Sequence, residues 1–147
     1  MIKIAICDDQ KEYLDTAKNL ITQYGAEKDV PFDITEFSNP SDLLDETVEY
    51  DIYLLDVCMP GITGMSLATE LRAKRIESPI VFLTSYSDYA VQAFGVNATH
   101  YIVKPYTKEE FFNGVDKALA AININSPKTI KLKIEGGYKT IPVYNIV

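Results

Sequence analysis

The chain has 147 residues, of which 47% are apolar, so it suits one full domain with a remainder and can bury one sizeable core. Its formal charge of −7 argues against nucleic-acid binding by bulk charge. No signal peptide and no apolar run near the ~20 residues of a membrane span is visible. The two cysteines lie beside acidic strand ends and do not form the pattern of a small disulfide-linked secreted domain. We therefore expect a reduced, cytoplasmic protein with no membrane partner.

Short apolar runs alternate with segments of helical periodicity through the first 124 residues. The runs are Ile2 to Cys7, Phe32 to Phe37, Ile52 to Leu55, Ile80 to Leu83 and Tyr101 to Val103. The first, third and fourth are almost continuously apolar, which is typical of strands buried on both faces of a parallel sheet. The second alternates between apolar and polar residues, which indicates an edge strand.

Helices are expected between and after these runs, at residues 13–24, 40–48, 65–75, 87–94 and 107–122. Gly25 is a plausible end for the first helix. Asn39-Pro40 reads as a cap followed by proline at the first helical position. Thr107 and Glu110 have the spacing of a capping box, which opens the last helix.

This alternation predicts an α/β fold of the doubly wound, flavodoxin-like (βα)5 type. Its parallel five-stranded sheet should have the strand order 2-1-3-4-5. Residues 1–124 then form the main domain, and Asn125-Ser126-Pro127 is a linker.

The remainder, residues 128–147, alternates charged and apolar side chains around a turn at Glu135-Gly136-Gly137 and predicts a β-hairpin-like extension. Residues from Ser126 onward carry +3, which leaves −10 on the first 125. This asymmetry indicates either two regions with different partners or a solvated basic tail. Because a lone hairpin is only marginally stable, the segment is either an arm or the start of a second domain cut short.

Chemically active side chains stand where four of the predicted strands end. These are Asp8 and Asp9 after the first strand, Asp56 after the third, Thr84 after the fourth and Lys104 after the fifth. The carboxyl ends of parallel strands meet at one edge of a sheet, and ligands bind there where the strand order reverses. We therefore expect these five side chains to converge.

The three carboxylates would repel one another by roughly 4 kcal/mol per pair at ~4 Å and an effective dielectric constant of about 20. Either one carboxylate keeps a proton or a hard divalent cation binds among them. Oxygen ligands that leave room for water favour Mg²⁺, and a backbone carbonyl near Cys58 is expected to assist. A multi-histidine metal site is excluded because His100 is the only histidine.

With a metal bound, Asp56 can act as a nucleophile toward a phosphoryl group. Catalysis would then rest on positioning and charge neutralisation. Mg²⁺ would hold one phosphoryl oxygen, the ammonium of Lys104 a second, and the hydroxyl and backbone of Thr84-Ser85 the third.

Each of these residues also has an ordinary explanation. Asp9 could be a helix N-cap supported by Glu12, and Asp56 could be a loop acid. Thr84 could cap the next turn, and Lys104 could lie on the surface. A single site is favoured because all of these residues end strands at one edge of the sheet.

These residues together resemble the receiver domain of bacterial two-component response regulators. The resemblance covers about Met1 to Ile124. It rests on Asp8-Asp9, on Asp56-Val-Cys-Met-Pro-Gly-Ile-Thr-Gly, on Thr84-Ser85 and on Lys104-Pro105. It implies that Asp56 is the phosphoacceptor, phosphorylated by a sensor histidine kinase with Mg²⁺ held by Asp8, Asp9 and Asp56. The only catalysis implied is self-phosphorylation and autodephosphorylation.

The same resemblance implies that Lys104 contacts the phosphoryl group and that Thr84 and Tyr101 form a switch. It also implies a cis bond before Pro105, where a trans turn is the alternative. Tyr101 could equally be a half-buried strand tyrosine. Phosphorylation would shift a population and remodel the face formed by the fourth helix, fifth strand and fifth helix. That face would form a homodimer or dock a partner.

The tail from Lys128 to Val147 resembles the opening strands of the LytTR DNA-binding domain. Twenty residues are too few for an independent domain. We therefore expect a regulator truncated after these strands, with DNA contacted only through the missing remainder.

Three other functions compete with this interpretation. A haloacid-dehalogenase-type phosphotransferase needs an aspartate two residues after the nucleophile, where Cys58 stands. A flavodoxin-like FMN module needs a Ser/Thr/Gly-rich phosphate loop, where Asp8-Asp9-Gln10-Lys11 stands. The third is a receiver that docks partners independently of phosphorylation.

Overall fold

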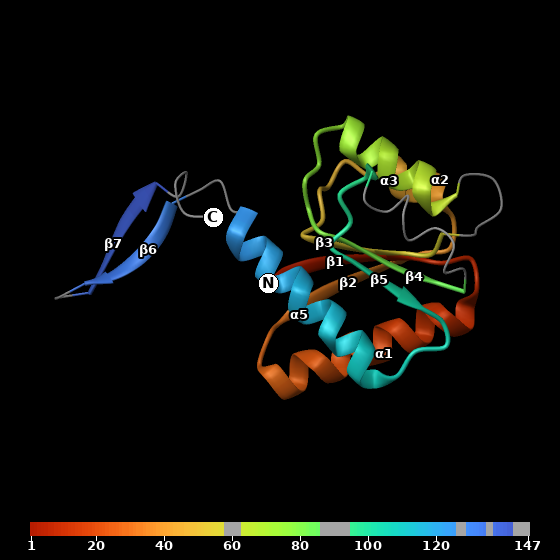
Figure 1. Cartoon of the computed structure of the whole chain (residues 1–147), viewed down its shortest axis with the longest axis horizontal. Helices are drawn as coiled ribbons and strands as arrows, with labels where there is room; N and C mark the ends of the chain where they lie inside the picture. Colours follow the sequence, from red (N-terminus) through yellow and green to blue (C-terminus); the bar gives the residue numbers. More distant parts are fainter. Residues whose placement is uncertain (58–62, 86–94, 126–128, 135–136, 143–147) are drawn as a thin grey trace.

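A computed structural model (Figure 1) describes residues 1–57, 63–85, 95–125, 129–134 and 137–142. In chain order its elements are β1 Ile2–Cys7, α1 Lys11–Lys28, β2 Phe32–Phe37, α2 Pro40–Leu44, β3 Ile52–Leu55, α3 Gly64–Ala73, β4 Ile80–Thr84, β5 His100–Val103, α5 Lys108–Asn125, β6 Thr129–Ile134 and β7 Gly137–Pro142. The helix predicted at 87–94 lies outside the described residues.

Strands β1 to β5 form one parallel sheet in the order β2-β1-β3-β4-β5. This order confirms the prediction, including β2 as an edge strand. Figure 1 shows α1 and α5 on one face of the sheet and α2 and α3 on the other. The arrangement is the doubly wound α/β sandwich that the alternation of strands and helices indicated.

The core is divided by the sheet into two apolar clusters. Tyr53 and Phe82 point toward the α2 and α3 side, whereas Leu54 and Val81 point toward α1 and α5. Because successive strand residues face opposite layers, central strands covered on both faces need apolar residues at every position. This explains why β3 and β4 read as unbroken apolar runs.

Two predicted helix ends were wrong. Helix α1 continues past Gly25 to Lys28 and ends at Asp29, which has a φ of 56°. Gly25 instead permits close packing, since a Cβ there would lie 2.7 Å from the Val30 carbonyl oxygen. Helix α2 ends at Leu44, and Val48 beyond it is 43% exposed.

Two predicted caps are confirmed. The Asn39 side chain accepts a hydrogen bond from the backbone N–H of Ser41, with Pro40 at the first helical position. At α5, the Thr107 hydroxyl accepts from Glu110 N and the Glu110 carboxylate accepts from Thr107 N, at 3.1 and 2.9 Å. Both caps satisfy N–H groups that a helix start leaves unpaired.

Strands β6 and β7 pair antiparallel with each other in a separate two-stranded sheet. The predicted hairpin-like extension is therefore present, with its return strand starting at Gly137. That this hairpin opens a second domain remains a prediction. None of the helices in the described parts of the chain has the length and apolarity needed to cross a bilayer.

Candidate functional site

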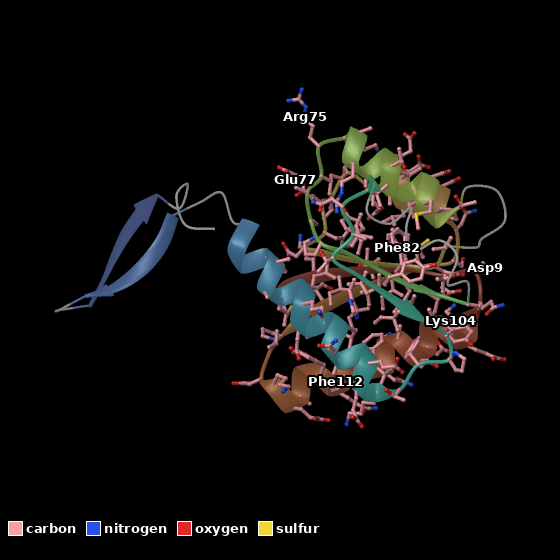
Figure 2. All side chains as sticks on the ribbon, viewed as in Figure 1. Asp9, Arg75, Glu77, Phe82, Lys104 and Phe112 are labelled. Atoms are coloured by element: carbon pink, nitrogen blue, oxygen red, sulfur yellow. The ribbon has the colours of Figure 1, made fainter. Side chains whose placement is uncertain are left out.

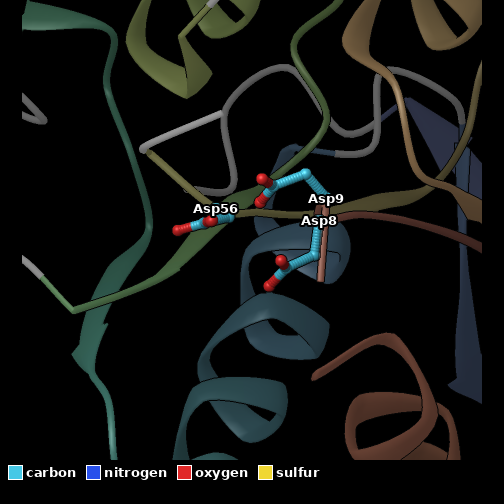
Figure 3. A group of neighbouring side chains, drawn as sticks. All are labelled: Asp8, Asp9 and Asp56. Atoms are coloured by element: carbon cyan, nitrogen blue, oxygen red, sulfur yellow. The ribbon is translucent and has the colours of Figure 1, made fainter. Parts of the chain in front are cut away.

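The three predicted metal-binding acids meet at the carboxyl end of the sheet. Backbone hydrogen bonds fix two of them, from Asp8 N to the Phe37 carbonyl and from Asp56 N to the Cys7 carbonyl, both 3.0 Å. One carboxylate oxygen from each of Asp8, Asp9 and Asp56 lies within 4.8 Å of the others, and Figure 3 shows the three side chains together. Asp8 and Asp56 are buried, and Asp9 is exposed.

Asp9 does not cap the following helix, contrary to the ordinary explanation considered for it. The N-cap position of α1 is Gln10, whose side chain makes no capping hydrogen bond. Instead, Asp8 Oδ1 accepts a hydrogen bond from Gln10 N at 2.9 Å. This bond orients the Asp8 carboxylate.

Lys104 is buried among these acids and is not a surface lysine. Its Nζ lies 2.7 Å from Asp8 Oδ2 and 3.8 Å from Asp56 Oδ1. The side chains of Lys104 and Asp8 are only 3% and 6% exposed. Figure 2 shows Lys104 and Asp9 near each other at the right of the view, with Arg75 and Glu77 at the upper left of the five-stranded fold.

Thr84 and Tyr101 lie on β4 and β5, two neighbouring strands of the sheet. Thr84 is fully buried at the end of β4, and its carbonyl accepts a hydrogen bond from Lys104 N at 2.7 Å. Tyr101 is partly buried on β5, with its ring centroid 6.0 Å from that of Phe82. The Lys104–Pro105 bond is cis, as the resemblance implied. The predicted backbone ligand, Cys58, lies outside the described residues.

Gly64 is a site residue that the sequence pattern did not single out, although it ends the motif that begins at Asp56. A Cβ at Gly64 would lie 2.0 Å from the Asp56 carbonyl oxygen and 2.8 Å from Val57 Cα. Real Cβ atoms do not approach backbone this closely. Only glycine therefore lets the start of α3 pack against the segment that carries Asp56.

The sequence pattern did not assign two tyrosines to the site, Tyr13, which contacts Lys104, and Tyr106, which lies near Asp8. The Tyr13 ring lies under the ammonium, with Lys104 Nζ 3.7 Å from the ring centroid. The Tyr106 hydroxyl is buried and has no hydrogen-bond partner among the described residues. Burial, and then the Asp8 carboxylate, raise the pKa of Tyr106 to about 12. Tyr106 therefore stays neutral at physiological pH.

Cys7 lies directly before the acids but does not take part as a thiolate. Burial, followed by the charge of Asp8, raises the pKa of the Cys7 thiol to about 12. The thiol remains protonated at neutral pH, and a protonated thiol is neither a metal ligand nor a nucleophile.

The donor set fits a hard divalent cation. Three carboxylates and one ammonium sum to a formal charge of −2, which one divalent ion would neutralise. All three side-chain ligands are oxygens, and Asp9 leaves the group open to water on one side. These are the properties of a Mg²⁺ site that keeps several waters. A carboxylate beside such an ion and an ammonium is suited to phosphoryl transfer.

Comparison with known proteins identifies close parallels. The family model described as the response regulator receiver domain matches residues 4–116. The sensory transduction protein LytT of Oceanobacillus iheyensis is 32% identical over 140 residues, covering 90% of this chain and 55% of LytT. The transcriptional regulatory protein LytR of Staphylococcus aureus strain N315 is 31% identical over 121 residues, covering 81% of this chain and 48% of LytR. This chain thus spans about half the length of these curated relatives.

Solved structures agree in fold. The response regulatory domain of protein mrkE from Klebsiella pneumoniae has a TM-score of 0.75 and 26% identity, covering 83% of this chain and 98% of that one. The response regulator TrrA from Thermotoga maritima, solved in complex with Mg(2+)-BeF, has a TM-score of 0.70 and 29% identity, covering 80% and 99%.

Proposed function

The chain belongs to the response regulator receiver domain family, and on that premise we propose that it accepts a phosphoryl group on Asp56. The observation that carries this proposal is the setting of the Asp56 carboxylate. It is buried at the end of β3, grouped with Asp8 and Asp9 within 4.8 Å, and 3.8 Å from the Lys104 ammonium. Asp8 has the same two neighbours, but its two oxygens accept hydrogen bonds from Gln10 N and from Lys104 Nζ.

Each residue has a defined part in this proposal. Asp8, Asp9 and Asp56 hold Mg²⁺, which when bound neutralises charge on the incoming phosphoryl group. An Asp56 oxygen forms a bond to phosphorus while the bond from phosphorus to the leaving group breaks. With a phosphohistidine of a sensor histidine kinase as donor, the leaving group is the imidazole, which takes up a proton. The Lys104 ammonium and the Thr84 hydroxyl bind phosphoryl oxygens.

The phosphoryl group would act on the rest of the protein by shifting a population. A change from mostly inactive to mostly active needs roughly 5 kcal/mol of differential stabilisation. A few charge-assisted hydrogen bonds to the phosphoryl group, at ~1.5–3 kcal/mol each, suffice for this. Thr84 would move toward the phosphoryl group, and Tyr101 would turn inward. The face of the fourth helix, β5 and α5 would then form a homodimer or dock a partner.

The parent protein would be a cytoplasmic transcription regulator of the LytT and LytR kind. The β6–β7 hairpin would be the start of its DNA-binding domain, with DNA contacted through the remainder of that domain. The support for this is the similarity to regulators named LytT and LytR and the antiparallel hairpin after α5.

Mass measurement after treatment with phosphoramidate, with and without Mg²⁺, tests the proposal. We expect the unmodified chain to gain one phosphoryl group only with Mg²⁺, and Asp56→Asn to gain none. Asp51→Asn is the matched control, because Asp51 lies just before the same strand, is exposed, and accepts a backbone hydrogen bond from Lys3. Equal labelling of Asp56→Asn on the same peptide would show that the assignment is wrong. A wild-type chain that gains no phosphoryl group would favour a docking receiver instead.

A further inference from the structure

The Lys104 ammonium has a third neighbour besides its two carboxylates, the face of the Tyr13 ring. Nζ lies 3.7 Å from the ring centroid, within the ~6 Å range of a cation–π contact. Tyr13 belongs to the first turn of α1, where its N–H donates to the Gln10 carbonyl at 3.0 Å. The ring is therefore anchored on the helix that starts directly after Asp8 and Asp9.

The surroundings of the ammonium show why this ring matters. An ammonium has three N–H donors, and the Lys104 side chain is only 3% exposed, so water cannot satisfy them all. Asp8 Oδ2 accepts one at 2.7 Å. Asp56 Oδ1, at 3.8 Å, is an ion-pair partner beyond hydrogen-bonding distance. The face of the Tyr13 ring, 3.7 Å from Nζ, is a further source of stabilisation.

From this geometry we infer that Tyr13 is a positioning residue, which holds the Lys104 ammonium beside Asp56 while Asp8 binds the divalent cation. This inference rests on the proposed function. Asp8 is both the hydrogen-bond partner of Lys104 and a member of the metal-binding group, so a bound cation weakens its hold on the ammonium. The aromatic ring carries no charge and does not bind the cation. Its attraction for Lys104 is therefore the same before and after metal binding.

The neighbouring Tyr106 supports this inference. Its buried hydroxyl has no partner among the described residues, and its ring lies 5.6 Å from that of Phe111. The Tyr106 hydroxyl and the Lys104 side chain, two residues apart in the chain, are thus both shielded from water. Cation–π attraction is stronger in such desolvated places than on the surface. A four-carbon lysine stem is otherwise flexible, so the ring restricts where the ammonium can go.

The test compares Tyr13→Leu with Tyr13→Phe in the full chain. The leucine removes the aromatic face, and the phenylalanine keeps it while removing only the hydroxyl. With saturating Mg²⁺, we expect the rate constant for phosphorylation of Asp56 by phosphoramidate to fall about tenfold in Tyr13→Leu. It should stay within about twofold in Tyr13→Phe. In a Lys104→Ala background, Tyr13→Leu should cause no further loss, because the ring acts through the lysine.

A second readout does not depend on phosphorylation. In Mg²⁺, acetic anhydride should acetylate Lys104 several-fold faster in Tyr13→Leu than in the parent or in Tyr13→Phe, as read by peptide mass. The inference fails if Tyr13→Phe behaves like Tyr13→Leu, if the loss persists in Lys104→Ala, or if Lys104 is acetylated equally in all three chains. If the parent chain gains no phosphoryl group on Asp56, the proposed function fails, and the acetylation rates still decide the role of Tyr13.

Discussion

Replacing Lys104 with methionine should separate the two effects of the buried ammonium, on stability and on cation binding. At an effective dielectric constant of about 20, the distances of 2.7 Å to Asp8 and 3.8 Å to Asp56 correspond to roughly 6 and 4 kcal/mol of attraction. Desolvation of the ammonium offsets much of this. Removing one partner of a buried ion pair typically costs about 3–5 kcal/mol. We therefore expect Lys104→Met to lower the free energy of unfolding by about 3 kcal/mol without divalent cations at pH 7.

Lys108→Met is a matched control for this experiment. Lys108 Nζ lies 2.8 Å from Glu27 Oε2, almost the same distance, but these side chains are 48% and 50% exposed. Exposed pairs contribute ~0–1 kcal/mol because water screens them. The difference between the two variants therefore measures the effect of burial on the Lys104 pair.

Magnesium should affect the two variants differently. A cation bound only to the folded state stabilises it by about 2.7 kcal/mol at a concentration 100 times its Kd. Lys104→Met removes a positive charge next to the acids, so it should bind Mg²⁺ more tightly and recover more stability than Lys108→Met. The assay is urea unfolding followed by circular dichroism, with and without Mg²⁺. A Lys104→Met variant no less stable than Lys108→Met, or one that binds Mg²⁺ more weakly than the parent, would refute the reasoning.

Three further outcomes are expected. Gly64→Ala should lower the free energy of unfolding by ~1–3 kcal/mol, because its Cβ would overlap the Asp56 carbonyl. It should also weaken Mg²⁺ binding, as measured by calorimetry. Gly95→Ala is the control, because nothing lies within 4 Å of a Cβ at that position. Burial lowers the pKa of His100, so the unfolded chain binds the proton more readily. Neutral His100 therefore contributes to the free energy of unfolding above pH 6.5, and this contribution is lost as the pH falls toward the folded-state pKa. Between pH 7.5 and pH 5.5, urea unfolding should show a smaller decrease in the free energy of unfolding for His100→Gln than for the parent. Arg72→Met should lower the free energy of unfolding in urea by ~2–4 kcal/mol. Arg72 donates to four backbone carbonyls at 2.8–3.0 Å, and the variant would leave them without this donor. A decrease of less than about 1 kcal/mol would contradict this.

The strand order and the meeting of Asp8, Asp9 and Asp56 could be predicted, because both follow from local sequence pattern and a general rule. Buried parallel strands are apolar at every position, which β3 and β4 show clearly. The rule that ligands bind at the carboxyl ends of strands then brings Asp8 and Asp56 together. No long-range information beyond the strand order was needed.

The C-terminal ends of α1 and α2 could not be predicted, because they depend on contacts with residues outside each helix. The carbonyl of Leu44 at the end of α2 accepts a hydrogen bond from Lys74 Nζ at 2.7 Å, and no pattern near Val48 encodes that contact. Gly25 was read as a helix end, whereas its missing Cβ makes room for the Val30 carbonyl and the Phe32 ring. A glycine that ends a helix and one that admits a close neighbour look alike in a single sequence.

Tyr13 was missed for a related reason. The sequence predicted Tyr13 only as the start of a helix at 13–24, and α1 buries Leu14 and Ala17. Tyr13 lies at the margin of that buried face, where it meets Lys104, which follows β5 and is distant from Tyr13 in the sequence. Periodicity assigns a residue to a side of a helix, but it cannot name the neighbour there.

The contacts of Asp8 explain why stability and metal affinity should change in opposite directions when Lys104 is removed. Its two oxygens accept hydrogen bonds from Gln10 N and from Lys104 Nζ. A divalent cation must therefore compete with an ammonium for the same carboxylate, while exposed Asp9 offers it the easier first contact. Without the cation, the ammonium offsets the repulsion among the acids and stabilises the fold. When the cation binds, the same ammonium adds repulsion. If Lys104 only supported the fold, its removal would lower both the free energy of unfolding and the affinity for Mg²⁺. A lower free energy of unfolding together with a higher Mg²⁺ affinity would show that Lys104 and Mg²⁺ interact with the same carboxylates.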